Sequence, residues 1–513
     1  MDIDLAALPD DVETLHNLVR SLAAERASLR EAKAEIKRLN LIIKKLQRNQ
    51  FGRRAEQLDA DQLQLAFEDL NVDLARTEAN LALSPTEVET TKAQGERPSL
   101  PMHLDREDRR LDIEHQACPC CGGALHLIAE TVSEMLDHVP ARLRVVRICR
   151  PRYGCRACGT IHQAPAPERP IAKGLATPAL LAHVLVSKSC DHLPLYRQSQ
   201  IFARQGVELD RSTLANWVGG ACWWLEPLQA RLAEHVFASQ KLFADDTPIP
   251  VLDPGRGRTK TGRLWVYARD DRPWNGPDPP AAVYFYSPDR KAERPATHLT
   301  RFRGVLQADG YPGFERLGAS DKIQLAACWA HARRKFYDVH QATASPVAAE
   351  ALRRIAEIYA IEAAIRSHTA VARQSMRRSR SLPLVTAMKA WLERQLAQIP
   401  PSGGLADAIR YVLARWDSLC CFLDDGRVEL DNNTVERAIR PVTLGRKNHL
   451  FAGSDGGAER WATVCSLITT AKLNNVEPFA YLKNVLECMS NGHPASGLDE
   501  LLPWNWRPPV TLN

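Results

Sequence analysis

A chain of 513 residues is too long for a single hydrophobic core, so we expect about three or four domains. Lysine and arginine number 67 and aspartate and glutamate 61, a mild basicity that permits nucleic-acid binding without requiring it. No run of 18 apolar residues occurs and the N-terminus is acidic, which argues against membrane spans and a signal peptide. We therefore expect a soluble cytoplasmic protein, in which the 13 cysteines are better explained by metal binding than by disulfides.

The first segment has a heptad pattern. One core position holds Leu15, Leu22, Leu29, Ile36 and Ile43, and the other holds Leu18, Glu25, Ala32, Leu39 and Leu46. This pattern predicts a coiled coil within residues 1–60 and a homo-oligomer formed through it; the alternative is an amphipathic helix that packs on its own chain. Residues 61–110 include a proline-containing stretch with few large apolar residues, which predicts a linker.

Two C-x-x-C pairs follow at 111–165. Cys118 and Cys121 form the first, Cys155 and Cys158 the second, and a glycine follows each pair. Four thiolates suit a tetrahedral structural Zn²⁺ site. The alternatives are buried free cysteines or a redox pair.

Residues 170–225 have the pattern of a helix-turn-helix. A helix ending near Gly206, a turn and a short helix capped by Asp210 or Ser212 would present Arg211, Thr213 and Asn216 to a DNA groove. Any helical hairpin shares this pattern, so it is weak by itself.

From residue 240 onward the sequence pattern is typical of β-strands. Three strand-like runs, a helical piece and a fourth apolar run that stops at Asp309 predict a mixed α/β sheet. Neighbouring strand residues point to opposite faces, so only one of Asp245 and Asp246 can join Asp309 in a site. Two long amphipathic helices are expected at about 340–425, and Glu436 follows in the helix-like stretch "DNNTVERAIRP".

At this point the sequence resembles the transposases of the insertion sequence 66 family. The matching stretches include "CPCCGG", "YGCRACG", "ADDTPIPVL", "LQADGYPGFERL", "CWAHARRKF", "DNNTVERAIRPVTLGRKNHLFAGSDGG" and "ELLPWNW". The resemblance implies a ribonuclease H-like catalytic domain at 236–475 with a helical insertion, followed by a helical tail at 476–513. It further implies that Asp245, Asp309 and Glu436 form a D-D-E triad, although the family commonly has glutamate where this chain has Asp246.

The triad would hold two Mg²⁺ or Mn²⁺ ions. Partners implied by the resemblance are the terminal inverted repeats of a mobile element, target DNA and small accessory proteins of the same element. The location would be the bacterial cytoplasm, in association with the nucleoid when DNA is bound.

Basic residues near these motifs are candidates for DNA contact, the alternative being solvated helix faces and surface ion pairs. They are His331, Arg333, Arg334, Lys335, Arg437 and Arg440, together with Arg446 and Lys447 in an expected basic loop at 445–457.

The sequence thus predicts a transposase that cleaves 3′ ends and joins them to target DNA. Two alternatives are a catalytically silent DNA-binding repressor and a metal-dependent nuclease of ribonuclease H-like fold.

Overall fold

The computed structural model describes residues 143–149, 152–154, 161–163 and 167–508, apart from residues 173, 254, 256, 320 and 321. The expected coiled coil, the linker and the cysteines Cys118, Cys121, Cys155 and Cys158 lie outside the described residues. The chain divides into two units, Thr86–Ile161 and the remainder. A small two-stranded sheet is formed by β1 (Arg152–Gly154) and β2 (Ile161–Gln163).

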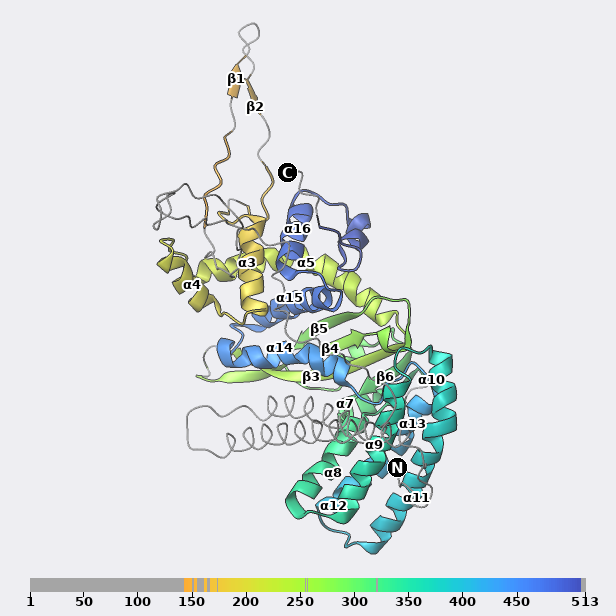
Figure 1. The fold of residues 1–513 in the computed structure, drawn as a ribbon. Helices are drawn as coiled ribbons and strands as arrows, with labels where there is room; N and C mark the ends of the chain where they lie inside the picture. Colours follow the sequence, from red (N-terminus) through yellow and green to blue (C-terminus); the bar gives the residue numbers. More distant parts are fainter. Residues whose placement is uncertain are drawn as a thin grey trace, which may run out of the picture. The chain divides into compact units, whose positions relative to one another are not determined.

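A five-stranded mixed sheet forms the centre of the larger unit (Figure 1). Its strands are β3 (Lys241–Leu252), β4 (Thr259–Arg269), β5 (Ala281–Ser287), β6 (Gly304–Ala308) and β7 (Ile323–Ala326). Their spatial order is β5-β4-β3-β6-β7; β3, β4 and β5 are antiparallel, β6 is parallel to β3, and β7 is parallel to β6. The predicted mixed α/β sheet is confirmed, including α6 (Glu293–His298) between β5 and β6 in the chain.

Two long helices, α14 (Asn433–His449) and α15 (Asp455–Leu473), cover one face of this sheet. Phe243, Ile249 and Val251 of β3 share a buried cluster with side chains of both helices, among them Val435, Ala438, Ile439, Val442, Trp461 and Ala462. Side chains alternate between the two faces of a strand. The odd-numbered residues of β3 therefore face α14 and α15.

Three helices precede the sheet: α3 (Pro178–Ser189), α4 (Leu195–Arg204) and α5 (Arg211–Phe237). The expected turn is present, with Gly206 at φ 80°, a conformation that glycine adopts without strain. The expectation of a short third helix is wrong, because α5 has 27 residues and runs to the start of the sheet. Asp210 stands at its N-cap position, but its side chain makes no capping hydrogen bond.

The physical reason for the length of α5 is tertiary packing. Gly219, Gly220 and Pro227 weaken its helical propensity. However, the helix packs against α15 and β5, and its apolar positions are fully buried over several turns beyond Pro227. Burial of several large side chains outweighs propensity losses of about 1–3 kcal/mol each.

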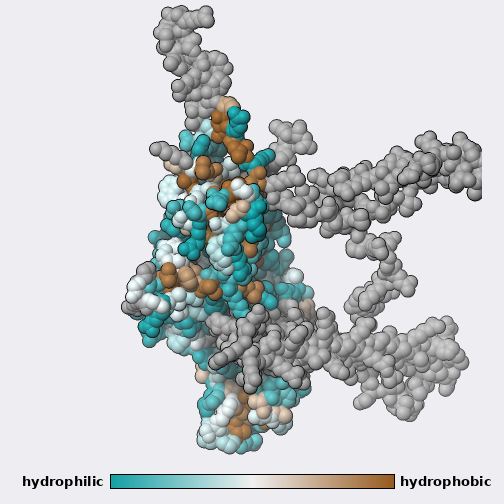
Figure 2. Space-filling model, turned by 90° about the vertical axis from the view of Figure 1, so that its left-hand side faces the viewer, coloured by the Kyte–Doolittle hydropathy of each residue, from teal (hydrophilic) through white to brown (hydrophobic). Residues whose placement is uncertain are grey.

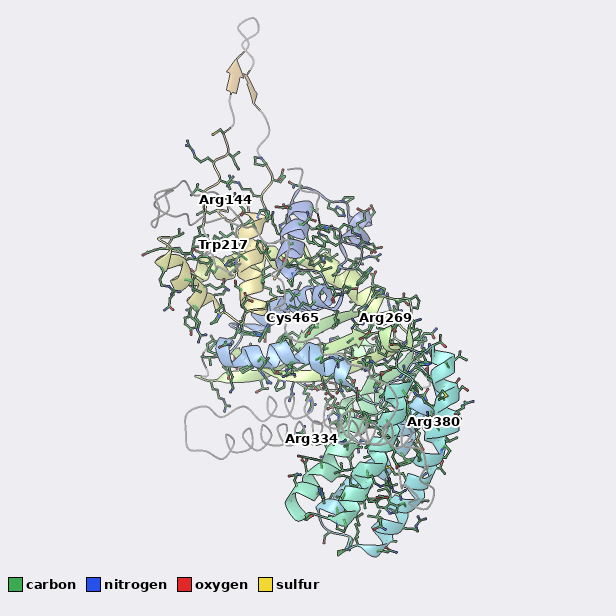
Figure 3. The ribbon with its side chains drawn as sticks, in the orientation of Figure 1. Arg144, Trp217, Arg269, Arg334, Arg380 and Cys465 are labelled. Atoms are coloured by element: carbon green, nitrogen blue, oxygen red, sulfur yellow. The ribbon has the colours of Figure 1, made fainter. Side chains whose placement is uncertain are left out.

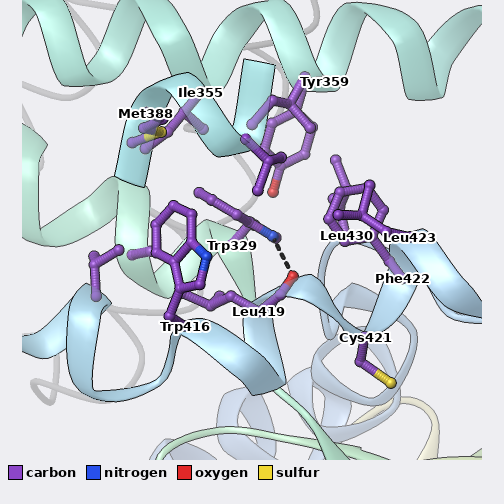
Figure 4. Packing of buried hydrophobic residues seen from close by; sticks show 14 of the residues in the cluster. Trp329, Ile355, Tyr359, Met388, Trp416, Leu419, Cys421, Phe422, Leu423 and Leu430 are labelled. Carbon is purple, nitrogen blue, oxygen red and sulfur yellow. Dashed lines mark hydrogen bonds between the residues drawn. The ribbon is translucent and has the colours of Figure 1, made fainter. Parts of the chain in front are cut away.

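A helical insertion separates β7 from α14, and its helices share a hydrophobic core with Val305 of β6 and Ala326 of β7 (Figure 4). Its elements are α8 (Trp329–Thr343), α9 (Pro346–Ala364), α10 (Ala370–Met376), the π-helical η4 (Arg377–Ser381), α11 (Leu382–Gln398), α12 (Gly404–Ala414) and α13 (Trp416–Asp424). The indole Nε1 of Trp329 donates a 2.8 Å hydrogen bond to the carbonyl oxygen of Leu419, which joins α8 to α13. These helices run from Trp329 to Asp424, compared with the expected insertion at about 340–425.

The remaining described elements are short, except for the C-terminal α16. They are η2 (Arg272–Trp274), α7 (Pro312–Glu315), η3 (Leu317–Ala319), α16 (Pro478–Ser490) and η5 (Ala495–Leu501). α16 packs against α3, so the C-terminal part of the described chain contacts the helices that precede the sheet. No helix in the described part of the chain is both long and apolar enough to cross a membrane.

Candidate active site

The two neighbouring aspartates of β3 have different surroundings. Asp246 is fully buried at its side chain and forms ion pairs with Arg263 (Nη1 to Oδ2, 3.0 Å) and Arg290 (Nη2 to Oδ1, 2.8 Å). Asp245 points to the opposite face, because successive strand residues alternate. That face is the one covered by α14.

Asp309 lies beside Asp245. In the parallel pairing of β3 with β6, Ala244 is the partner of Ala308, and each aspartate is the next residue along its strand direction. Side-by-side residues of parallel strands point to the same face. The pleat and the register together therefore bring Asp245 and Asp309 together and direct the side chain of Asp246 to the opposite face.

Burial and neighbouring carboxylates change the acidity of this pair. Burial raises the pKa of Asp245 well above its usual value, and the charges of Asp309 and Asp246 raise it further. Burial also raises the pKa of Asp309, although the neighbouring His331 opposes this effect at both carboxyls. Like charges held this close favour either a shared proton or a bound cation.

The start of α14 is tied to the same two strands. The amide Nε2 of Gln307 on β6 donates 2.8 Å hydrogen bonds to the carbonyl oxygens of Glu429 and Asp431. Asn432, at the N-cap position of α14, donates from Nδ2 to the carbonyl oxygen of Ala244 at 3.1 Å. These bonds anchor the first turn of α14, which carries the buried Glu436, next to the strand positions that precede both aspartates.

Two residues from the start of α8 also reach this site. Ligand atoms of Cys328, His331 and Glu436 all lie within 4.8 Å of one another. The backbone N–H of Asn432 donates to the sulfur of Cys328 at 3.4 Å, which links the starts of α8 and α14. His331 therefore lies near both the aspartate pair and Glu436, whereas the sequence predicted only DNA contact for it.

Cys328 was missed as a site residue. The signal that could have found it is the C-x-x-H spacing in "CWAHARRKF", where both residues fall in the first turn of a helix that follows a strand. This stretch is one of those that resemble the family, but only its histidine and its basic residues were predicted to have a role, namely DNA contact.

The candidate DNA-contact residues differ in exposure. Lys335, Arg437, Lys447, Arg211 and Asn216 are exposed, whereas Arg334, Arg440 and Thr213 are partly buried. Arg334 belongs to α8 in the helical insertion (Figure 3). Figure 2 views the larger unit from the side of α4 and shows hydrophilic and hydrophobic side chains interspersed on that face.

Two basic candidates are buried and do not have the exposure that a phosphate contact needs. Arg333 is 4% exposed, and Arg446 is 9% exposed and donates from Nη1 to the carbonyl oxygen of Pro248 at 2.7 Å. The expected basic loop at 445–457 is also wrong, because residues 445–449 form the last turn of α14 and α15 begins at Asp455. Arg446 thus fastens α14 to β3.

The donor set fits a divalent cation. Carboxylate oxygens are the ligands that Mg²⁺ prefers, and a cation would compensate the crowded charge of Asp245 and Asp309. The cysteine and histidine add softer donors at the side of Glu436. The four cysteines of the C-x-x-C pairs lie outside the described residues.

Comparison with protein families accounts for most of the chain. Residues 173–460 match the model described as the transposase IS66 family, and residues 466–504 match the IS66 C-terminal element. Residues 115–159, which include all four C-x-x-C cysteines, match the zinc-finger binding domain of transposase IS66. Residues 38–109 match a model described as transposase C of IS166 homeodomain, across the expected linker.

A zinc finger, a homeodomain-type region and a carboxylate-bearing α/β sheet in one chain define a DNA-acting enzyme. The chain belongs to the IS66 family of transposases. Membership implies a divalent metal in the catalytic domain, and the zinc-finger match supports a structural Zn²⁺.

Three relatives from Sinorhizobium fredii are similar over nearly the full length. The uncharacterized protein y4jD is 45% identical, over 98% of this chain and 97% of that protein. The uncharacterized protein y4qI is 40% identical, over 99% of both chains, and the uncharacterized protein y4hP is 41% identical, over 91% of this chain and 88% of that protein.

Proposed function

We propose that this transposase binds the terminal inverted repeats of its mobile element, cleaves their 3′ ends and transfers them to target DNA. Asp245, Asp309 and Glu436 are the proposed metal-binding catalytic triad, and Mg²⁺ the proposed ion. The five-stranded sheet, with three antiparallel strands followed by two parallel ones, is proposed to be a ribonuclease H-like core.

The observation that carries this proposal is the position of two crowded carboxyls beside the anchored start of α14. Asp245 and Asp309 are adjacent through the strand register, and Asn432 and Gln307 attach the chain just before Glu436 to the same strands. Buried carboxyls whose pKa values are raised by burial and by neighbouring carboxylates are typical of functional sites. Asp246, by contrast, is held by ion pairs with Arg263 and Arg290, as a structural carboxylate would be.

The chain's own residues prepare the site for phosphodiester cleavage. When bound, Mg²⁺ supplies an activated water and stabilises negative charge on the leaving oxygen. Arg263 and Arg290 pair with Asp246 and hold its carboxylate on the face opposite Asp245, although its charge still raises the pKa of both Asp245 and Asp309. The exposed Lys335 and Arg437 on α8 and α14 are proposed to bind DNA phosphates.

The remaining partners follow from the same proposal. The α4–α5 region is proposed to contact the element ends through Arg211 and Asn216, which are exposed at the start of α5. Oligomerisation through the N-terminal heptads and assistance from accessory proteins of the element also remain proposals. Nucleoid association would follow from DNA binding.

The test is a cleavage and joining assay with labelled DNA that carries the sequences flanking the gene, unlabelled target plasmid and Mg²⁺. We expect the wild type to produce cut and joined DNA, whereas Asp309→Asn and Glu436→Gln bind the ends but do not cut them. Asp407→Asn is the matched control, because Asp407 is exposed and pairs with Arg410 on its own helix.

Each outcome separates the candidate functions. Cleavage without joining would favour the nuclease, and end binding without cleavage by the wild type would favour the repressor. Normal cleavage by Glu436→Gln would remove Glu436 from the triad. Equal loss of binding and cleavage in Asp309→Asn would contradict the separation of DNA recognition from chemistry.

A further inference from the structure

The starts of α8 and α14 bring three different metal-ligand types together. Cys328 precedes α8, His331 follows one turn later, and Glu436 lies in the first turn of α14. Their sulfur, nitrogen and oxygen ligand atoms are all within 4.8 Å of one another. The sequence separates Cys328 from Glu436 by more than 100 residues, so only the fold creates this cluster.

The ligand chemistry distinguishes this cluster from a magnesium site. Mg²⁺ takes oxygen ligands in near-octahedral geometry and does not favour sulfur. Zn²⁺ and Co²⁺ bind cysteine, histidine and carboxylate together in tetrahedral sites, with water completing the coordination. A cysteine, a histidine and a glutamate together therefore suit a cation of intermediate softness, such as Zn²⁺ or Co²⁺.

The geometry is close to what such an ion requires. With bonds of about 2.0–2.3 Å, the ligand atoms of a tetrahedral zinc site are about 3.3–3.8 Å apart. Ligand atoms within 4.8 Å reach this spacing by moving about 1 Å or less each. Cys328 and Glu436 are 3% and 5% exposed, so the ion would be largely shielded from water.

A structural role for the sulfur alone is the simpler alternative. The sulfur of Cys328 accepts the N–H of Asn432, and burial raises the pKa of its thiol to about 12. Backbone N–H groups of Ala330 and His331 also act on this thiol, but such a structural role uses neither the imidazole of His331 nor the carboxylate of Glu436, which the fold places beside the sulfur. A metal would bind the thiolate and release the thiol proton to solvent.

We propose that Cys328, His331 and Glu436 form a binding site for Zn²⁺ or Co²⁺ that shares Glu436 with the magnesium site, so that zinc inhibits cleavage. The inhibition rests on the proposed function, because it requires Glu436 to serve Mg²⁺. The binding of Zn²⁺ or Co²⁺ does not depend on the proposed function. Because His331 also lies near Asp245 and Asp309, a second divalent ion at this position would compete with Mg²⁺ by charge as well.

The binding test uses the full-length chain loaded with one zinc ion per chain, the number that the zinc finger holds, with all other zinc removed. Co²⁺ is then added, and thiolate-to-cobalt charge-transfer absorption is recorded with the number of ions bound. We expect one additional Co²⁺ with thiolate absorption in the wild type and in Cys420→Ser, whose free cysteine lies on α13. We expect Cys328→Ser to lose the absorption and His331→Asn to bind Co²⁺ at least about 10-fold more weakly.

Two results would overturn the site: absorption spectra of wild type and Cys328→Ser that are identical after Co²⁺ addition, or unchanged affinity in His331→Asn. Circular dichroism and thermal melting check that each variant is folded. Should Cys328→Ser not fold, His331→Asn decides the question, because its loss of affinity requires the histidine as a ligand.

The inhibition test measures Mg²⁺-supported cleavage at increasing Zn²⁺ concentrations, each variant being compared with its own zinc-free activity. Half-inhibition should need at least about 10-fold more zinc in His331→Asn than in wild type. Equal zinc sensitivity would refute the shared site. A wild type that binds Co²⁺ but never cleaves would contradict the proposed function and leave the metal site supported.

Discussion

Replacement of Asn432 by alanine tests how Glu436 is positioned. The Asn432 side chain is fully buried, and its Nδ2 donates to the carbonyl oxygen of Ala244, one residue before Asp245. This hydrogen bond attaches the N-cap position of α14 to β3. Alanine removes the donor and leaves the carbonyl of Ala244 without it.

The expected cost follows from the lost bond. A buried hydrogen bond contributes about 1 kcal/mol net, and leaving a buried partner unsatisfied costs about 1–3 kcal/mol. We expect the free energy of unfolding to fall by about 1–3 kcal/mol. A displacement of Glu436 of about 1 Å would reduce cleavage by roughly 10- to 100-fold, because catalysis depends strongly on the placement of reacting groups.

The assay compares Asn432→Ala with Asn474→Ala. Asn474 is a matched control, because its Nδ2 donates to the carbonyl oxygen of Pro280 at 2.8 Å and ties α15 to the residue before β5, away from the carboxylates. Both variants should lose stability in urea titrations, but only Asn432→Ala should lose cleavage of labelled element ends. Equal cleavage by the two variants would refute the positioning role of Asn432.

Further predictions concern pH, the helical insertion and zinc. Because the folded-state pKa values of Asp245 and Asp309 are raised, the folded protein binds more protons than the unfolded chain, so stability without added Mg²⁺ should fall as pH rises above the usual aspartate value of 3.8. In thermal melting, the melting temperature of Asp245→Asn should fall less steeply with rising pH than that of the wild type. The same pH dependence in both proteins would contradict this account. Arg377→Ala should destabilise the insertion by about 3–5 kcal/mol in urea titrations, because Arg377 is buried and binds the carboxylate of Glu362 through Nε at 2.7 Å and Nη2 at 2.6 Å. Arg353→Ala, which removes an exposed ion pair with Glu357 and Glu350, should cost less than about 1 kcal/mol. Zinc removal by a chelator should weaken binding to element ends before the catalytic sheet melts, and unchanged binding after verified removal would count against a DNA-binding zinc finger.

Local sequence patterns were sufficient to predict the strands and to identify the candidate acidic residues of the site. The alternating and β-branched runs predicted β3, β4, β5 and β6, because burial of one or both faces imposes that composition. The family motifs singled out Asp245, Asp309 and Glu436, and they led to the IS66 family that the comparisons confirm. Pleating alone also required that Asp245 and Asp246 point in opposite directions.

Which aspartate faces α14 was decided by contacts far apart in the sequence. The arginines that bind Asp246 lie 17 and 44 residues away, and the register that places Asp245 beside Asp309 depends on pairing between β3 and β6. Local composition predicts neither the arginine partners nor the strand register, because both depend on how the strands are arranged in the folded protein.

The length of α5 and the membership of the site depend on tertiary structure for the same reason. The glycines and Pro227 in α5 would predict a break in the helix from local sequence, but packing against α15 and β5 keeps the helix continuous. Cys328 becomes a neighbour of Glu436 only because the helical insertion packs against β6 and β7 and returns the chain to the sheet at Asn432. The sequence by itself therefore determined the family, the strands and the candidate acids, whereas long-range packing decided which side chains meet.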